Sequence, residues 1–280
     1  MKVIREQTII NEVKRLCQEA NFYLPSDIQE SIEDAYQKED SEIAKQTLNI
    51  LKENAKIACE TSSPICQDTG MACVFVEIGQ EVYVKGSLKD AINEGVRLGY
   101  QEGYLRKSVV DDPVFDRVNT KDNTPAVIHY EIVEGDQLKI TVAPKGFGSE
   151  NMCQVKMLKP SDGLQGIKDF VLKVVNDAGP NACPPIVIGV GIGGTFDKVT
   201  YLSKKAMLKK ANSHHSDIRY AKLEEELLEL INQTGIGPAG YGGKTTALSL
   251  NIETYPTHIA GMPVAVSICC HVARHKEVIL

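Results

Sequence analysis

The sequence predicts a mixed α/β (α+β) fold, in which a helical N-terminal segment packs on a mixed β-sheet body with flanking helices. Apolar residues recur at helical spacing through residues 1–58. From residue 72 they alternate instead, and glycine turns then separate strands from helices. A chain of 280 residues with 42% hydrophobic content can bury a large core. We therefore expect one domain over residues 1–280, comprising the helical segment 1–58 and a mixed body 59–280.

The N-terminal segment reads as successive helices. The first is indicated by apolar residues three or four positions apart, which are Ile9, Val13, Leu16 and Ala20. Ser26 and Gln29 form a Ser-x-x-Gln capping box for a second helix. Residues 41–58 show helical spacing again and predict a further helix.

Strands are expected from residue 72. Residues 72–78 and 82–84 alternate around Gly79 and predict a short hairpin. Ser87, with Asp90 three positions later, forms a capping pattern that predicts a helix over 88–105. A second hairpin is predicted over 126–143. The loop 144–151 follows it, and its backbone N–H groups either bind an anion or simply end the hairpin.

The remaining sequence alternates between helices and strands. Gly179-Pro180 ends a helix over 161–178. A buried strand is expected over 186–190, helices over 197–211 and 217–233, and strands over 247–252 and 264–268. Residues 235–244 are too rich in glycine to form a regular element.

Charge and hydropathy disfavour nucleic acid and membranes as binding partners. The formal net charge of −6 disfavours nucleic acid, because phosphate binding favours a basic surface. No apolar run reaches the roughly 18 residues that span a bilayer, and residues 1–7 lack the apolar stretch of a signal peptide. We expect a cytoplasmic protein without a membrane partner.

Eight cysteines in a chain of this length indicate reduced thiols rather than a secreted disulfide framework. Cys17 falls on the apolar face of the first helix. Cys59, Cys73 and Cys153 belong to no pattern, so all four are expected to be small buried hydrophobic residues.

Three cysteine segments, set among glycine or proline, stand out. They are Cys66-Gln67-Asp68-Thr69-Gly70, Ala182-Cys183-Pro184-Pro185 and Ser267-Ile268-Cys269-Cys270. Their wide separation excludes a local C-x-x-C metal motif, so any shared site must be assembled by the fold. Cys269 and Cys270 are neighbours at a strand end and should face opposite ways, so only one of them can join a given site.

A dinucleotide fingerprint must also be weighed. Gly189-x-Gly191-x-x-Gly194 follows a predicted strand, but the acidic residue that should hold the ribose about 20 positions later is missing. A tight glycine turn beside the Cys183 loop explains the glycines better. His258, just before the last strand, is by itself more typical of a structural than of a catalytic histidine.

The three cysteine motifs resemble those of the iron–sulfur hydro-lyases of the class I fumarate hydratase and L(+)-tartrate dehydratase family, specifically their α subunit. The resemblance implies a [4Fe–4S] cluster with Cys66, Cys183 and Cys270 as ligands and one iron not ligated by a protein thiolate. Cys270 is chosen because it, and not Cys269, lies four residues before Arg274. Such an iron acts as a Lewis acid towards the substrate.

The resemblance also implies a dicarboxylate site. Gln67, Arg106 and Gly148 would bind substrate oxygens. Asp68 and His258 would position the substrate or relay protons as the catalytic residues.

The implied function is reversible hydration of fumarate to (S)-malate, with L(+)-tartrate dehydration as the nearest alternative. Longer family members carry a second domain, so the resemblance implies a separate β subunit, in an α2β2 assembly, without which the chain is inactive. A non-catalytic iron–sulfur or zinc sensor is a third hypothesis, but a sensor has no use for Gln67, Asp68, Arg106 and His258.

Overall fold

The computed structural model describes all 280 residues and confirms the mixed α/β class. Its contacts divide the chain into two compact units. The first unit comprises Met1–Leu24, Ala55–Phe147 and Arg274–Leu280, and the second comprises Pro25–Asn54 and Gly148–Ala273. The helix α3 (Glu42–Thr61) contributes residues to both.

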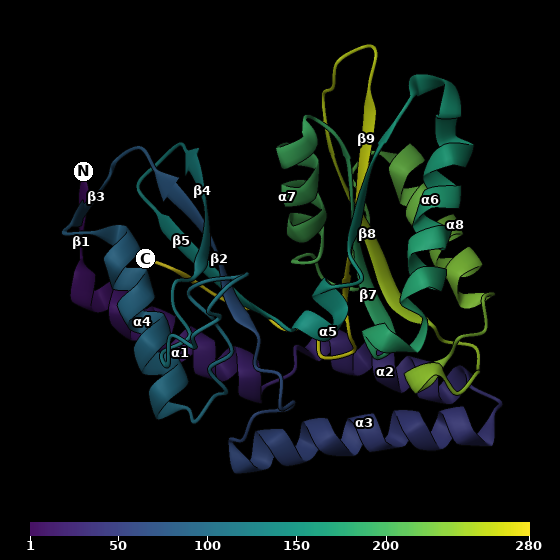
Figure 1. Cartoon of the computed structure of the whole chain (residues 1–280), viewed down its shortest axis with the longest axis horizontal. Helices are drawn as coiled ribbons and strands as arrows, with labels where there is room; N and C mark the ends of the chain where they lie inside the picture. The colour runs from purple at the N-terminus through teal and green to yellow at the C-terminus, as the bar shows by residue number, and fades with distance from the viewer. The chain divides into compact units, whose positions relative to one another are not determined.

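The first unit is a four-stranded sheet with helices on one face (Figure 1). The sheet contains β2 (Met71–Gly79), β4 (Val127–Val133), β5 (Leu138–Lys145) and β10 (Lys276–Ile279). The helices α1 (Glu6–Phe22) and α4 (Leu88–Glu102) pack on it. The strands β1 (Lys2–Arg5) and β3 (Val82–Lys85) form a separate two-stranded sheet. The strand order is β10-β5-β2-β4, with only β2 and β4 parallel. The alternating residues of β2, such as Val74 and Val76, face the core beneath α1 and α4.

The two predicted hairpins are wrong, although their strands exist. β3 pairs with β1, and β2 lies between β4 and β5, which therefore do not touch each other. The N–H groups that could close the first hairpin are used elsewhere, because Gln80 donates to Val133 and Glu81 to Gly135. Alternation predicts a strand but leaves its partner open. The short strands β1 and β10 were not predicted.

Cys17 is buried between α1 and α4, as predicted. Gly99 of α4 lies so close that an added Cβ would come within 2.8 Å of the Cys17 Cβ. Burial raises the pKa of the Cys17 thiol to about 12, which leaves it an inert core residue. Cys73 is also buried, but the prediction is wrong for Cys59, which is exposed, and Cys153 is only half-buried.

The second unit is a four-stranded sheet with helices on both faces (Figure 1). Its other elements are α2 (Ser26–Lys38), α5 (Phe147–Glu150, whose first residue belongs to the first unit), β6 (Gln154–Leu158), α6 (Gly163–Ala178), β7 (Ile186–Gly193), α7 (Phe196–Ala206), α8 (Ile218–Asn232), β8 (Ala247–Tyr255) and β9 (Met262–Cys269). The strand order is β6-β9-β7-β8. The strand β6 was not predicted, and Ser26 begins α2 as its first helical residue instead of capping it.

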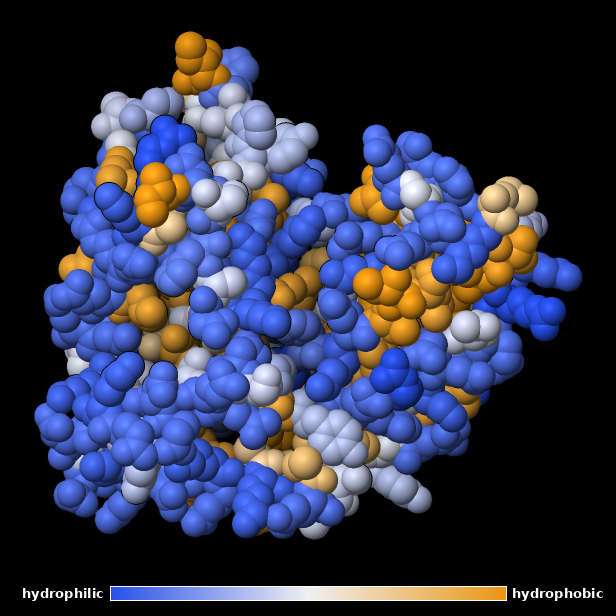
Figure 2. Space-filling model, turned by 180° about the vertical axis from the view of Figure 1, so that it is seen from behind, coloured by the Kyte–Doolittle hydropathy of each residue, from blue (hydrophilic) through white to orange (hydrophobic).

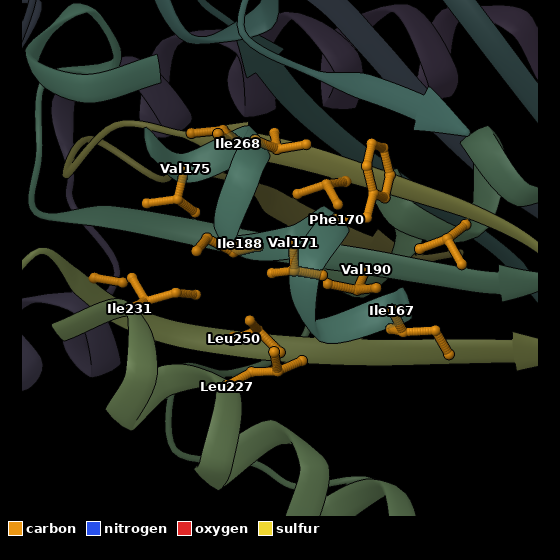
Figure 3. Close-up of a cluster of buried hydrophobic side chains, with 14 of the residues drawn as sticks. Ile167, Phe170, Val171, Val175, Ile188, Val190, Leu227, Ile231, Leu250 and Ile268 are labelled. Atoms are coloured by element: carbon orange, nitrogen blue, oxygen red, sulfur yellow. The ribbon is translucent and has the colours of Figure 1, made fainter. Parts of the chain in front are cut away.

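The core of the second unit lies under α6 and α8. Figure 3 shows how their apolar side chains meet those of β7, β8 and β9, for example Val171 against Val190 and Leu227 against Leu250. Every residue of β7 is buried, because α7 covers the opposite face of the same strand. This double cover explains why β7 is continuously hydrophobic or glycine rather than alternating.

The glycines of the dinucleotide-like motif allow α7 to pack directly on β7. A Cβ added to Gly189 would lie 2.0 Å from the Ser203 carbonyl oxygen, and one on Gly191 would lie 2.2 Å from that of Val199. Gly193 and Gly194 form the turn, but at the end of β7 that is remote from Cys183, so the expected turn beside the Cys183 loop is wrong.

Hydrophilic side chains cover most of the face in Figure 2, with apolar side chains interrupting them in patches. Charged residues make up 24% of the sequence. None of the helices combines the length and apolar character of a membrane span.

We expect Gly189→Ala to lower the free energy of unfolding by roughly 1–3 kcal/mol, because the new methyl group would push α7 away from β7. The matched control is Gly261→Ala in the same unit, where an added Cβ meets nothing nearer than 3.9 Å. Urea unfolding of both variants measures the difference, and equal midpoints would contradict this account of the motif.

Candidate active site

The first group of predicted site residues lies on the loop between α3 and β2. Cys66 is half-buried there, and its Sγ accepts the N–H of Asp68 at 3.4 Å. The Gln67 Oε1 lies 3.5 Å from the same sulfur. The Cys66 sulfur is therefore in contact with both residues that follow it.

Three side chains fix the backbone carbonyls of this loop. The Tyr100 hydroxyl donates to the carbonyl oxygens of Thr69 and Gly70 at 2.7 and 3.0 Å. The Asn123 amide also donates to Gly70 at 3.0 Å, and the Arg274 Nη2 donates to Asp68 at 2.6 Å. Tyr100 is fully buried, and desolvation raises its pKa well above the usual value, so the hydroxyl keeps its proton as a donor.

The same network attaches the segment that carries Arg106. The Thr69 hydroxyl donates to the Arg106 carbonyl oxygen at 2.9 Å, and the Asn123 Oδ1 accepts the N–H of Ser108 at 2.8 Å. Asn123 thus holds the cysteine loop with its amide nitrogen and the arginine segment with its amide oxygen. The position of Arg106 relative to the loop is therefore set by hydrogen bonds.

Asp68 and Arg106 line a common pocket of about 510 Å³ in the first unit. Its other lining residues are Gly70, Met71, Ser108, Val109, Val110, Pro113, Arg117 and Phe147. Two arginines line the pocket, and the Arg117 guanidinium also donates to the Pro113 carbonyl oxygen. Arginine binds carboxylates through paired N–H groups, so this lining suits a small dianion.

The Asp68 carboxylate is engaged by the backbone on both sides. Its Oδ1 accepts the N–H of Gly70 at 3.0 Å, and its Oδ2 accepts the N–H of Phe147 at 2.9 Å. The Phe147 N–H of the loop 144–151 is thus used by the protein's own Asp68 carboxylate. This geometry favours a positioning role for Asp68 over proton transfer.

The second unit brings Cys183 and Cys270 to one edge of its sheet. Cys183 precedes β7, and Cys270 follows β9, which runs antiparallel to β7 with Cys269 opposite Val187. The His271 Nδ1 donates to the Cys183 carbonyl oxygen at 3.1 Å, so the two segments are in contact. Cys269 is buried, whereas Cys270 is half-buried and Cys183 is exposed.

Gly148 lies near the same edge. A Cβ added there would be 3.8 Å from the Asn181 carbonyl oxygen, two residues before Cys183, and would meet no closer atom. A side chain at position 148 would therefore meet no steric clash, and the glycine leaves open space beside the Cys183 segment.

His258 lies away from Cys270 within the second unit. It lies on the exposed loop between β8 and β9, where its Nδ1 accepts the N–H of Ala260 at 3.1 Å. The eight residues of β9 separate this loop from Cys270, about 27 Å at about 3.4 Å per residue. His258 precedes Cys270 by only 12 positions in the sequence, but the extended strand β9 carries the chain across the sheet between them.

Sequence reasoning missed Tyr100, Asn123 and Arg117 as parts of the site. Tyr100 resembled any apolar-face residue of α4, and Asn123 any loop asparagine. The only available signal was Arg117, a cation in the same short segment as Arg106. Arg274 was used merely to choose between Cys269 and Cys270.

Comparison with known proteins identifies the family of the chain. Residues 10–279 match the family model described as fumarate hydratase (Fumerase). A Methanocaldococcus jannaschii protein, provisionally named L(+)-tartrate dehydratase subunit α, is 45% identical over 95% of each chain. The L(+)-tartrate dehydratase subunit α of Escherichia coli K12 is 31% identical over 100% of this chain and 94% of its own length.

Both the match to the family model and the match to these relatives extend over nearly the whole chain, through every cysteine segment and the arginine-lined pocket. The chain therefore belongs to the fumarate hydratase (Fumerase) family of hydro-lyases.

Proposed function

We propose that this chain is the α subunit of a hydro-lyase that acts on a four-carbon dicarboxylate with a hydroxyl group at C2. The observation that carries the proposal is the pocket in which Arg106 and Arg117 lie beside the loop that bears Cys66. Two cations can bind the two carboxylates of such a substrate. The fixed carbonyls of the loop keep the adjacent thiol in one position.

We propose Cys66, Cys183 and Cys270 as the ligands of a [4Fe–4S] cluster. The residues fit this group, because Cys66 accepts an N–H at its sulfur and the other two thiols lie on contacting segments at one sheet edge. Burial of Cys269 favours Cys270 as the third ligand. When bound, a cluster with only three thiolate ligands supplies a Lewis-acidic iron for the substrate hydroxyl.

The chain's own residues would bind and orient the substrate. Gln67, Arg106 and the Gly148 backbone N–H would bind its carboxylate or hydroxyl oxygens. Asp68 would act indirectly, by fixing Gly70 and Phe147 around the pocket. His258 is left out of this proposed site because of its distance along β9.

The reaction removes a proton from C3 and hydroxide from C2, or adds both in reverse. The names of the relatives favour L(+)-tartrate as substrate, ahead of the fumarate expected from the sequence. Fumarate hydration to (S)-malate remains the second candidate, because the matching family model is that of fumarate hydratase. Values of kcat/KM on both substrates, measured with the assembled enzyme, decide between them.

The proposed ligand set predicts the iron content of variants. Serine in place of Cys66, Cys183 or Cys270 should remove most iron and sulfide from anaerobically purified protein, because serine is a poor ligand for iron–sulfur clusters. Cys269→Ser is the matched control and should keep both. Loss of the cluster in Cys269→Ser with retention in Cys270→Ser would reverse our choice between these neighbours.

The pocket predicts a role for the Arg106 guanidinium. Arg106→Gln should lower kcat/KM about 10-fold or more, since hydrogen bonds to charged groups contribute about 1.5–3 kcal/mol. Arg97→Gln, which removes a cation on α4 that is paired with Glu94 and does not line the pocket, serves as the control and should change the rate little. Equal kinetics for the two variants would remove Arg106 from the substrate site.

A separate β subunit is also part of the proposal, because the relatives are named α subunits. We expect the cluster-loaded α chain alone to show little turnover of L(+)-tartrate or (S)-malate, and addition of the family's β subunit from the same organism to restore it. Full activity of the α chain alone would overturn the two-subunit proposal.

A further inference from the structure

The loop between α4 and β4 exposes an unusual number of large apolar side chains. Tyr104 is 91% exposed, Val114 67%, Phe115 87% and Val118 54%. Single exposed apolar residues are common, but several on one short segment indicate an interaction surface.

This exposure does not come from a loosely built loop. The Asp112 Oδ1 accepts the N–H groups of Val114 and Phe115 at 2.7 and 3.0 Å, and the Arg117 guanidinium donates to the Pro113 carbonyl oxygen. The Asn119 side-chain amide donates to the Lys107 carbonyl oxygen at 2.9 Å, and Val110 forms a β-bridge with Asn119. A loop fixed in this way loses little conformational entropy when a partner covers it.

The same loop forms one side of the arginine-lined pocket. Ser108, Val109, Val110, Pro113 and Arg117 line that pocket, while Val114 and Phe115 lie between Pro113 and Arg117 in sequence. A protein that covers Val114 and Phe115 therefore sits at the rim of the pocket and can place its own side chains there.

The pocket needs such a contribution. Its lining includes two arginines and Asp68, whose two oxygens are bound by N–H groups, but no histidine, lysine, tyrosine or cysteine. Loss of water requires a group that accepts the C3 proton. A subunit docked at the rim is well placed to supply it.

We propose that residues 104–118 form the docking surface for the β subunit, with Phe115 as its central anchor. This inference rests on the proposed function, which gives the chain a β subunit. Aromatic anchors surrounded by smaller apolar contacts are typical of the residues that dominate binding energy at interfaces. The remaining contact area would come from the surfaces around this loop.

The test compares Phe115→Ser with a control from the same unit, Ile132→Ser on β4, whose side chain is 74% exposed. Isothermal titration of purified α chain with the family's β subunit from the same organism gives Kd. Loss of an anchor of at least 2 kcal/mol corresponds to a rise in Kd of about 30-fold or more for Phe115→Ser. The control should stay within about twofold of the unsubstituted chain, since exposed residues outside the anchor contribute little.

The outcomes separate the two proposals. If the unsubstituted chain does not bind the β subunit, the proposed function fails. If it binds and Phe115→Ser binds equally well, the docking surface is wrong. If Phe115→Ser instead disperses a dimer of α chains and leaves β binding unchanged, the surface belongs to a second copy and our assignment is overturned.

Hydrogen exchange on the unsubstituted proteins gives a second measurement that does not depend on a variant folding. The amides of residues 104–118 should exchange more slowly once the β subunit is bound. Unchanged exchange in this loop, with protection appearing elsewhere, would contradict the proposal.

Discussion

The hydrogen bonds to the carbonyl groups of Asp68, Thr69 and Gly70 are the constraint on which the candidate site depends. Tyr100, Asn123 and Arg274 come from three separate parts of the sequence, yet each donates to this one loop. Thr69 and Gly70 are buried, so their carbonyl groups need hydrogen-bond partners from the protein. Bonds from a buried phenol and a buried guanidinium hold it in one conformation, and with it the Cys66 thiol and the wall of the pocket.

In the second unit, the sheet brings two cysteine segments together. Because β9 returns antiparallel to β7, the start of one strand and the end of the other meet at one edge, which brings the Cys183 and Cys270 segments into contact. The pleat then separates the two neighbouring thiols, with Cys269 turned into the protein. The same antiparallel return sends His258 to the far edge. One topological feature thus brings the two cysteine segments together and separates them from His258.

Glycines lie in two distinct packing environments in this chain. At Gly189 and Gly191 the missing side chain lets α7 rest on β7, where even a methyl group would meet a backbone carbonyl. At Gly148 it leaves open space near the Cys183 segment. A motif of spaced glycines is therefore ambiguous until the neighbouring element is known, because close packing and ligand approach require the same absence of a Cβ.

The sequence by itself determined the class of fold, most helices, the existence of the longer strands and the three cysteine segments, because periodicity and short motifs are local properties. It also pointed to Arg106, through resemblance. Only the tertiary structure decided which strands pair, that β2 lies between β4 and β5, and that His258 is remote from Cys270. It alone identified Tyr100, Asn123 and Arg117. Strand partners and hydrogen bonds between distant segments are set by packing of the whole unit, which no local pattern records.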